Sequence, residues 1–340
     1  MEDRRLLLGR RAAQSRKDHR ARTDHHERSP ETVGQKRRRA SATGTGRERT
    51  AFSIITWNVD SLRALFVNDD GQSLHNILTS RKPVLICLLE HKLQDSHHED
   101  SNRVRAQLEA LADSHGYDAT WTFSPRAGRD GLVTLACRDA AMIVTPPTEP
   151  QQLLHDACVA ERRLLYVELD QLHVLFAYVP NSGRDGRLEY RLNQWEPSVR
   201  AYLNSLDGKK PVLYQGDLNV AHHRALDCWG TTDSQFGGFK ASGRTREEMV
   251  AMDTLLSECN LVDGFRHFHP NERSGTCWAQ KKAGEPEQRE HWKRYDYAVV
   301  SKPLVEKGKG RVRLVDVRHL HDAFEGGRPD HLPVESCFEF

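Results

Sequence analysis

Short apolar runs that end in a polar side chain recur along residues 51–340 of this chain. Residues 52–57 are rich in β-branched and aromatic side chains and are followed by Asn58. Residues 84–89 are almost entirely aliphatic and are followed by Glu90. Runs of this kind are typical of buried strands. The pattern therefore predicts two strands that each deliver a polar group to the edge of a sheet.

Three further runs, residues 132–136, 164–169 and 173–179, also predict strands. In residues 164–169, apolar and polar side chains alternate with the period of two that a half-buried strand shows. A short link, residues 170–172, joins this strand to the next one. A link of this length favours an antiparallel hairpin. The predicted sheet is therefore not purely parallel.

Helical spacing appears in three segments between the predicted strands. Val104, Leu108 and Leu111 lie at i, i+4 and i+7, which places them on one helix face. Residues 188–203 and 247–259 show the same kind of spacing. In the first of these two segments, Pro197 is predicted to kink the helix or to split it in two.

Residues 211–220 combine a strand with a dense polar end. Residues 211–214 read as a strand, and Gly216, Asp217 and Asn219 follow. Side chains alternate along an extended backbone, so Asp217 and Asn219 can point the same way while Leu218 enters the core. Gly216 permits a turn or the close approach of another group. Taken alone, these residues fit an Asx-rich turn equally well.

Composition narrows the class of protein. The chain has 340 residues and 37% hydrophobic content, and it has no apolar run near the ~18 residues that cross a bilayer. We expect a soluble chain of one large domain or two smaller ones. The seven cysteines are scattered without a CxxC pair. This argues against a disulfide framework or a structural zinc site and favours a reducing compartment.

The positive charge is concentrated at the amino terminus. Residues 1–50 hold 15 Lys and Arg against 7 Asp and Glu, a surplus of +8, which leaves 35 against 41, or −6, for residues 51–340. Residues 1–50 have few apolar side chains and are predicted to be a disordered basic tail. The basic cluster at residues 35–39 is typical of nuclear import or nucleic-acid contact, although a solvated charge run fits equally. We expect a nuclear protein, with a mitochondrion or another organelle as the alternative.

Six strand ends or adjoining turns carry the polar groups that we expect to form a site. They are Asn58, Glu90, Tyr178 with Asn181, Asp217 with Asn219, Asp296, and Asp330 with His331. Isolated carboxylates would be costly to bury, so we expect these groups to meet in one cleft. Oxygen-rich ligands without cysteine favour Mg²⁺ or Mn²⁺, and a lone histidine suits phosphate contact or proton transfer.

The same residues, in this order, resemble a known family. The motifs are Trp57-Asn58-Val59, the run ending in Glu90, residues 178–181, residues 216–222, residues 261–266, Thr276 with Trp278, residues 294–297 and Asp330-His331. They are similar to those of the exonuclease III type of apurinic/apyrimidinic (AP) endonuclease, in the endonuclease/exonuclease/phosphatase superfamily. The resemblance covers residues 53–334 and does not reach the first 50 residues.

The resemblance implies a fold and an activity. The fold is an α/β, four-layered sandwich in which two mixed β-sheets pack face to face and helices flank them, formed by residues 51–340. The activity is Mg²⁺-dependent hydrolysis of the DNA backbone 5′ to abasic sites, with Mn²⁺ as a possible substitute and with possible 3′–5′ exonuclease or 3′-phosphodiesterase activity. The implied partner is double-stranded DNA that contains abasic sites. We expect a monomer without membrane contact.

The resemblance also assigns roles to the polar groups. Glu90 becomes the principal metal ligand, Asn58 and Asp60 lie close by, and Asp330 supports the metal region. Asp217 and Asn219 orient or deprotonate the attacking water, and His331, held by Asp296, contacts the scissile phosphate. Tyr178 and Asn181 bind the phosphate or assist the leaving group. Arg184, Trp278 and Trp292 match positions that bind substrate.

Departures from the family pattern leave rivals open. Leu89 and His91 flank Glu90 where the family commonly has other residues, Cys277 replaces an aromatic side chain, and Pro329 replaces a serine. His223 stands where an acidic residue is usual. One rival is a divergent phosphodiesterase of the same fold that acts on RNA or a lipid headgroup. The other rival is a catalytically weak nucleic-acid-binding protein.

Overall fold

The structure is a computed structural model, and it describes residues 51–95, 98–126, 128–150, 156–183, 187–208, 210–228, 242–278, 292–323 and 329–340. The expected basic tail, residues 1–50, lies outside the described residues. The described residues contain no helix that is both long enough and apolar enough to cross a membrane. All seven cysteines are described, and all are free thiols.

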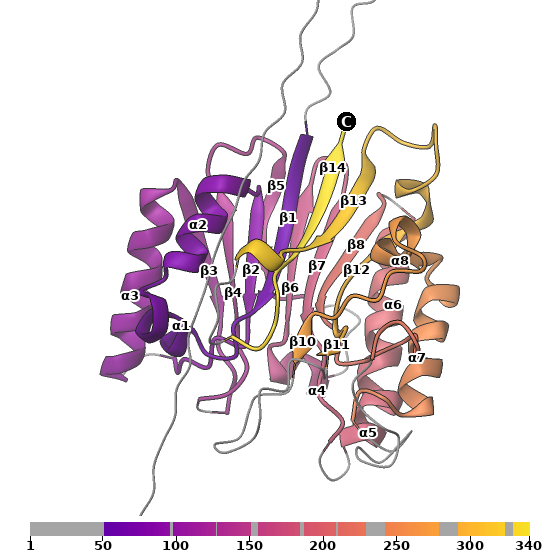
Figure 1. Cartoon of the computed structure of the whole chain (residues 1–340), viewed down its shortest axis with the longest axis horizontal. Helices are drawn as coiled ribbons and strands as arrows, with labels where there is room; N and C mark the ends of the chain where they lie inside the picture. Colours follow the sequence, from indigo (N-terminus) through magenta and orange to yellow (C-terminus); the bar gives the residue numbers. More distant parts are fainter. Residues whose placement is uncertain are drawn as a thin grey trace, which may run out of the picture. The chain divides into compact units, whose positions relative to one another are not determined.

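Six strands form the first sheet, in the order β13-β14-β1-β2-β4-β3 (Figure 1). Their bounds are β1 Ala51–Asn58, β2 Leu85–Leu89, β3 Tyr117–Thr122, β4 Leu132–Cys137, β13 Arg313–His319 and β14 Val334–Glu339. β1 and β2 are parallel, whereas every other neighbouring pair in this sheet is antiparallel. The strands predicted at residues 52–57, 84–89 and 132–136 are confirmed, and the sheet is mixed.

Six further strands form the second sheet, in the order β5-β6-β7-β8-β12-β9. Their bounds are β5 Ile143–Thr148, β6 Leu164–Leu169, β7 His173–Tyr178, β8 Val212–Asp217, β9 Leu261–Asp263 and β12 Asp296–Ser301. β7 and β8 are parallel, and the other neighbouring pairs are antiparallel. The predicted hairpin is the β6–β7 pair. β8 extends three residues beyond the predicted end at Tyr214, because β12 pairs with it as far as Asp217.

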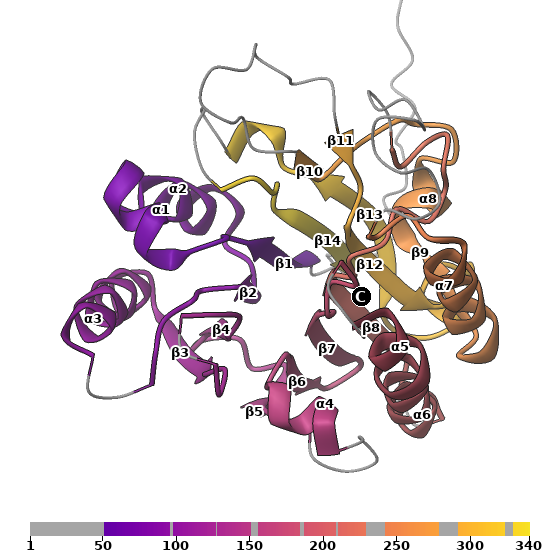
Figure 2. The ribbon, with the colours of Figure 1, turned by 90° about the horizontal axis from the view of Figure 1, so that it is seen from below.

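The two sheets face each other, and helices cover their outer faces (Figure 2). Apolar side chains of both sheets form the central core, among them Ile54, Cys87, Val167, Phe176 and Leu213. Helices α1 (Leu62–Asp69), α2 (Gln72–Arg81) and α3 (Glu99–Ser114) pack on the first sheet. Helices α6 (Glu196–Asp207) and α7 (Arg246–Glu258) pack on the second. The result is the predicted four-layered α/β sandwich.

Short elements complete the fold. They are α4 Asp156–Glu161, α5 Arg187–Tyr190, the π-helix η1 Arg191–Trp195, α8 Gly264–Phe268, the two-stranded ribbon β10 Cys277–Trp278 with β11 Trp292–Lys293, and the 3₁₀ helices η3 Lys302–Leu304 and η4 His321–Ala323. The helix is not split in two near Pro197, because α5, η1 and α6 follow one another without a gap and the backbone of Trp195 and Glu196 stays helical. Pro197 lies in the first turn of α6, so the change from π-helix to α-helix falls next to a residue that has no backbone N–H.

Candidate active site

Polar side chains of both sheets meet at one edge of the sandwich. In the second sheet Tyr178, Asp217 and Asp296 lie in one row, because β8 pairs Asp217 with Tyr178 of β7 and with Asp296 of β12. In the first sheet Asn58 ends β1 opposite Leu89, the residue before Glu90. Each sheet contains one parallel strand pair, and the carboxyl ends of parallel strands point the same way. This geometry explains why the strand ends converge.

Gly216 lets β7 and β8 approach closely beneath this row. Its φ of 151° lies in the region that favours glycine, and a Cβ atom there would lie 1.9 Å from the Ala177 carbonyl oxygen. No other residue fits without moving β7. The close approach predicted from the sequence is confirmed, and it holds Asp217 beside Tyr178.

Asn58 links the two sheets within the site. Its Nδ2 donates to the Asp217 carboxylate at 3.0 Å and to the Glu90 carboxylate at 3.2 Å. Its Oδ1 accepts from the backbone N–H of Asp60 at 3.0 Å. A single buried amide therefore fixes the distance between the two carboxylates.

Asn219 lies beside Asp217 and has few alternative orientations. The backbone N–H of Asn219 donates to Asp217 at 2.8 Å, and its Nδ2 donates to the Val179 carbonyl at 2.9 Å. Its Oδ1 accepts from Asn181 at 3.2 Å. Asn219 has a φ of 48°, a left-handed conformation that asparagine tolerates. Leu218 points into the core, as predicted.

His331 and Asp296 form a buried pair on the far side of Asp217. His331 Nδ1 lies 2.7 Å from an Asp296 carboxylate oxygen, and the His331 carbonyl accepts from the Trp57 indole at 3.0 Å. Burial disfavours the charged imidazolium, but the Asp296 carboxylate and the Cys277 side chain together outweigh burial and raise the pKa of His331 well above its usual range. The ring is therefore cationic at neutral pH, and Nε2 carries a proton that can be donated.

The pKa of Asp217 lies above that of a solvated carboxylic acid. Burial, reinforced by the Asp296 carboxylate, raises the pKa of Asp217 to about 7, while His331 and the hydrogen bonds from Asn219 and Asn58 oppose the rise. A carboxylate with a pKa near neutrality can take up a proton during a reaction and release it again. Burial also raises the pKa of Tyr178, so its phenol stays protonated.

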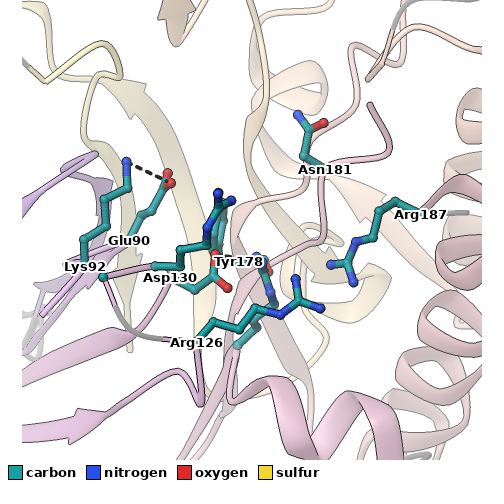
Figure 3. Close-up of a pocket in the computed structure, with 10 residues that line it drawn as sticks. Glu90, Lys92, Arg126, Asp130, Tyr178, Asn181 and Arg187 are labelled. Carbon is teal, nitrogen blue, oxygen red and sulfur yellow. Dashed lines mark hydrogen bonds and ion pairs between the residues drawn. The ribbon is translucent and has the colours of Figure 1, made fainter. Parts of the chain in front are cut away.

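Glu90 and Lys92 lie at a more exposed wall of the site, and both have left-handed backbone conformations, with φ of 59° and 57°. The Lys92 ammonium lies 3.2 Å from Glu90 (Figure 3). It also contacts the Asp60 carboxylate. Burial raises the pKa of Glu90, and the Lys92 charge opposes the rise. Two carboxylates thus share one cation.

His91, between them, shapes this turn. Its Nδ1 accepts from the Leu93 N–H at 2.9 Å, and its Nε2 lies 2.8 Å from the Thr122 carbonyl. Burial lowers the pKa of His91 to about 4, so the neutral ring serves as acceptor at one nitrogen and donor at the other. A Cβ at Gly131 would come within 2.4 Å of this ring. The departure at His91 is therefore accommodated by a glycine that directly precedes β4.

The donor set at the exposed wall fits a hard divalent cation. Glu90 and Asp60 offer carboxylate oxygens beside the Asn58 amide, whose Nδ2 faces Glu90, and these two acids outnumber the single ammonium of Lys92. The position that Lys92 takes between two carboxylates shows where positive charge is stabilised. Asp330, the third predicted ligand, adjoins His331. Its backbone carbonyl accepts from the backbone N–H of Trp278 at 3.1 Å.

A second group of possible ligands forms the buried side of the site. We call this side, formed by Asp217, Asp296 and His331, the buried wall. Asp217, Asp296 and His331 each offer one ligand atom, and these atoms lie within 4.8 Å of one another. Among the described residues, it is the only group of three His, Cys, Asp or Glu side chains whose ligand atoms lie that close together. One ring nitrogen of His331 is already held by Asp296. We therefore interpret this group as handling protons.

The predicted substrate-binding residues are placed in part. Trp278 and Trp292 face each other on the β10–β11 ribbon, with ring centroids 4.9 Å apart. Cys277 on the same ribbon forms an isolated antiparallel β-bridge with His331. The ribbon therefore adjoins the site, and its role as an aromatic wall for the substrate stays a prediction. Arg184 lies outside the described residues.

Sequence reasoning missed a buried arginine behind the site. Arg191 donates to the carbonyls of Leu218 and Asn219 at 2.8 Å each and pairs with Glu248 at 3.1 Å. It thus fixes the backbone that follows Asp217. The available signal was its position, three residues after Leu188 on the predicted apolar helix face, where a charged residue requires a partner.

The chain is similar to known nucleases in sequence and in fold. Residues 55–318 match the model of the Endonuclease/Exonuclease/phosphatase family. An exodeoxyribonuclease of Bacillus subtilis is 32% identical over 289 residues, which cover 84% of this chain and 98% of the relative. A DNA-(apurinic or apyrimidinic site) endonuclease of Dictyostelium discoideum is 27% identical over 294 residues, which cover 84% of this chain and 70% of the relative. The crystal structure of an AP endonuclease from Leishmania major superposes with a TM-score of 0.67 at 25% identity, covering 85% of this chain and 88% of that one.

Proposed function

The chain belongs to the endonuclease/exonuclease/phosphatase family, and we propose that it is a DNA-repair nuclease that hydrolyses the DNA backbone 5′ to abasic sites. One observation carries the proposal. A buried acid whose pKa is about 7, Asp217, lies between an asparagine that bridges to Glu90 and a histidine kept cationic by Asp296. This arrangement places a base, Asp217, and a proton donor, His331, close together in one site.

The buried wall would activate water and stabilise the developing charge. Asp217 accepts a proton from a water that Asn219 orients, since Asn219 is itself held by Val179 and Asn181. The His331 Nε2–H donates to a non-bridging phosphate oxygen, where negative charge accumulates. The Tyr178 phenol, kept protonated by burial, donates to the same phosphate or to the departing oxygen.

The exposed wall would hold the metal. We propose that Glu90 is the principal ligand and that Asn58, Asp60 and Asp330 support it. Oxygen donors of this kind favour Mg²⁺, with Mn²⁺ as a substitute. When bound, the cation supplies positive charge that offsets the negative charge of the phosphate oxygens.

A second activity has specific support. The Bacillus subtilis relative, named an exodeoxyribonuclease, is aligned over 98% of its length at 32% identity. We therefore propose 3′–5′ exonuclease or 3′-phosphodiesterase activity in addition to incision. Both reactions are phosphodiester hydrolyses, so the same residues would serve them.

Incision of a defined duplex tests the proposal. Purified full-length protein is incubated with a duplex that carries one abasic-site analogue, once with Mg²⁺ and once with a chelator. We expect a single cut 5′ to the analogue only when Mg²⁺ is present. An undamaged duplex of the same sequence and a duplex with a blocked 3′ end separate incision from 3′ trimming. The absence of metal-dependent cleavage at the analogue would refute the main proposal.

We further propose that the chain acts as a monomer on duplex DNA in the nucleus, guided by the basic cluster at residues 35–39. A fluorescent reporter fused to residues 1–50 tests the address, and its matched control carries alanines at residues 36–39. Nuclear accumulation of the first fusion and not of the second is the expected outcome. Mitochondrial accumulation would favour the organellar alternative.

A further inference from the structure

A cavity of about 550 Å³ opens beside the exposed wall of the site (Figure 3). Glu90, Tyr178 and Asn181 line one side of it. Five cationic side chains line the remainder, namely Lys92, Arg126, Arg129, Arg163 and Arg187. The roles described so far do not use Arg126, Arg129 or Arg187.

Three of the five cations are already paired with acids. The pairs are Lys92 with Glu90, Arg163 with Asp130 and Glu161, and Arg187 with Glu161. In the part of the chain that the structure describes, Arg126 and Arg129 have no ion pair. Asp60 also contacts Lys92, so four partner acids face the five cations, which leaves a formal net charge of +1.

Contacts within the protein hold the wall of the cavity in place without a ligand. The Arg163 guanidinium lies 4.5 Å above the Tyr178 ring, and Asp130, which is buried, holds Arg163 at 2.8 Å. Arg126 and Arg129 belong to the loop that Asp130 anchors. Figure 3 shows Arg126 and Arg187 extending toward each other across the cavity. A ligand between them would lie next to Tyr178.

We propose that this cavity binds a second phosphate group of the nucleic-acid strand, separate from the phosphate that is cleaved, and that Arg126 and Arg129 are its main contacts. The assignment rests on the proposed function, because it takes a nucleic-acid strand as the ligand. Guanidinium groups are suited to phosphate, which they bind through parallel hydrogen bonds. The net charge of +1 matches the single negative charge of one phosphodiester.

The double variant Arg126→Ala/Arg129→Ala tests the cavity. Its matched control is Lys307→Ala/Arg311→Ala, which also removes two exposed cations but lies near the start of β13, at the end of the sheet opposite to His331. Binding of a labelled duplex with an abasic-site analogue is measured by anisotropy in chelator, over a series of salt concentrations. We expect the slope of log affinity against log salt to fall by about 1 to 2 in the first variant only.

Steady-state incision provides the second readout. We expect KM to rise about tenfold in Arg126→Ala/Arg129→Ala while kcat stays within about twofold, because phosphate contacts position the strand. Equal salt slopes in the two double variants would overturn the assignment. Binding of deoxyadenosine monophosphate is measured in parallel, and a loss confined to this nucleotide would also overturn the strand assignment. Because binding needs no catalysis, a protein that binds but does not incise refutes the proposed function alone.

A second inference concerns Gln215, which is fully buried between the two sheets. Its amide nitrogen, Nε2, donates to the Val334 carbonyl at 2.9 Å and to the Thr56 hydroxyl at 3.2 Å. Its Oε1 accepts from the Ser336 hydroxyl at 2.7 Å. One side chain of β8 is thus bonded to both β1 and β14 of the opposite sheet.

The site contact lies one step further along the same strands. Asn58 follows Thr56 by two residues on β1, and Asp217 follows Gln215 by two residues on β8. Side chains two apart share a face of a strand. The Gln215–Thr56 contact and the Asn58–Asp217 contact are therefore successive links between the sheets. We infer that Gln215 is a positioning residue that sets the placement of Asp217 against Asn58.

Gln215→Met keeps the volume and removes the hydrogen bonds. Its matched control is Ser301→Ala, which removes a buried 2.8 Å bond to the Val212 N–H at the other end of β8. We expect kcat to fall about tenfold in Gln215→Met with KM nearly unchanged, and we expect neither to change in Ser301→Ala. Equal kcat values in the two variants would overturn the inference. Should Gln215→Met fail to fold, Ser336→Ala takes its place, because it removes one donor to Gln215, and a kcat equal to that of Ser301→Ala would overturn the inference in the same way.

Discussion

The two walls of the site are built differently. At the buried wall the Asp217, Asp296 and His331 side chains are almost inaccessible, and hydrogen bonds hold each of them. At the exposed wall the side chains of Glu90 and Lys92 are 18% and 29% accessible, and ion pairs hold them. Burial shifts pKa values strongly, whereas exposure allows cations and substrate to exchange. The comparison indicates that proton transfer belongs to the first wall and reversible binding to the second.

The comparison predicts its largest effect at Asp217. Asp217→Asn keeps the shape but cannot accept a proton, so kcat for incision should fall about 10³-fold or more. Binding of the duplex in chelator should change little, because the Asp217 side chain is buried and its contacts are to Asn58 and Asn219. Asp118→Asn, at an exposed surface pair with Arg138, is the control and should keep full activity. A kcat within tenfold of the wild type would remove the proton-handling role from the buried wall.

Arg191 supports the buried wall, and its loss should mainly reduce stability. Arg191→Met leaves Glu248, which is fully buried, without its cation, so the free energy of unfolding should fall by about 3–5 kcal/mol. Urea unfolding measures the change. The control Arg105→Met breaks an exposed i,i+4 pair with Glu109 and should cost less than about 0.5 kcal/mol. Equal losses in the two variants would show that the buried pair is not structural.

The features that the sequence predicts well are local. Residues 52–57 and 84–89 combine β-branched composition with a polar end, and this pattern is enough to locate Asn58 and Glu90. The sequence also indicates the role of Gly216, because a glycine inside a strand signals close approach. The resemblance adds the sandwich architecture, which apolar runs alone leave open between several sheet arrangements.

The features that the sequence leaves hidden depend on distant partners. β5 contains Pro146 and Pro147, which argue against a strand, yet it forms the edge of the second sheet, where one side needs no donor. The Arg191–Glu248 pair joins residues 57 positions apart. The link between Gln215 and Thr56 depends on how two sheets pack. No local pattern encodes such contacts, because each partner alone reads as an ordinary polar residue.

Acid should destabilise the folded protein through His319, the last residue of β13. This ring stacks on Phe265 at 4.1 Å, and Ser274 lies 2.6 Å from its Nδ1. Burial and the nearby Arg294 charge lower the pKa of His319 well below its usual value. The unfolded chain takes up a proton below about pH 6.5 and the folded chain does not, so His319 costs about 1.4 kcal/mol of stability per pH unit in that range.

The variant His319→Phe isolates this effect, because it keeps the stack on Phe265 and cannot titrate. Urea unfolding of both proteins is measured between pH 7 and pH 5. The wild type should lose more stability than the variant as the pH falls below about 6.5. Parallel curves would show that the folded and unfolded proteins bind a proton at His319 equally.

The smallest effect is expected at the exposed wall. Lys92→Met removes the ammonium that Glu90 and Asp60 share, and the accessible setting of this pair limits the change in the free energy of unfolding to about 1 kcal/mol or less. A divalent cation would then no longer compete with the ammonium for the two carboxylates. The Mg²⁺ concentration that gives half-maximal incision should therefore fall several-fold, while kcat at saturating Mg²⁺ falls far less than in Asp217→Asn. A rise in the required Mg²⁺ concentration would instead mean that Lys92 orients Glu90, and the exposed wall would then be as preorganised as the buried one.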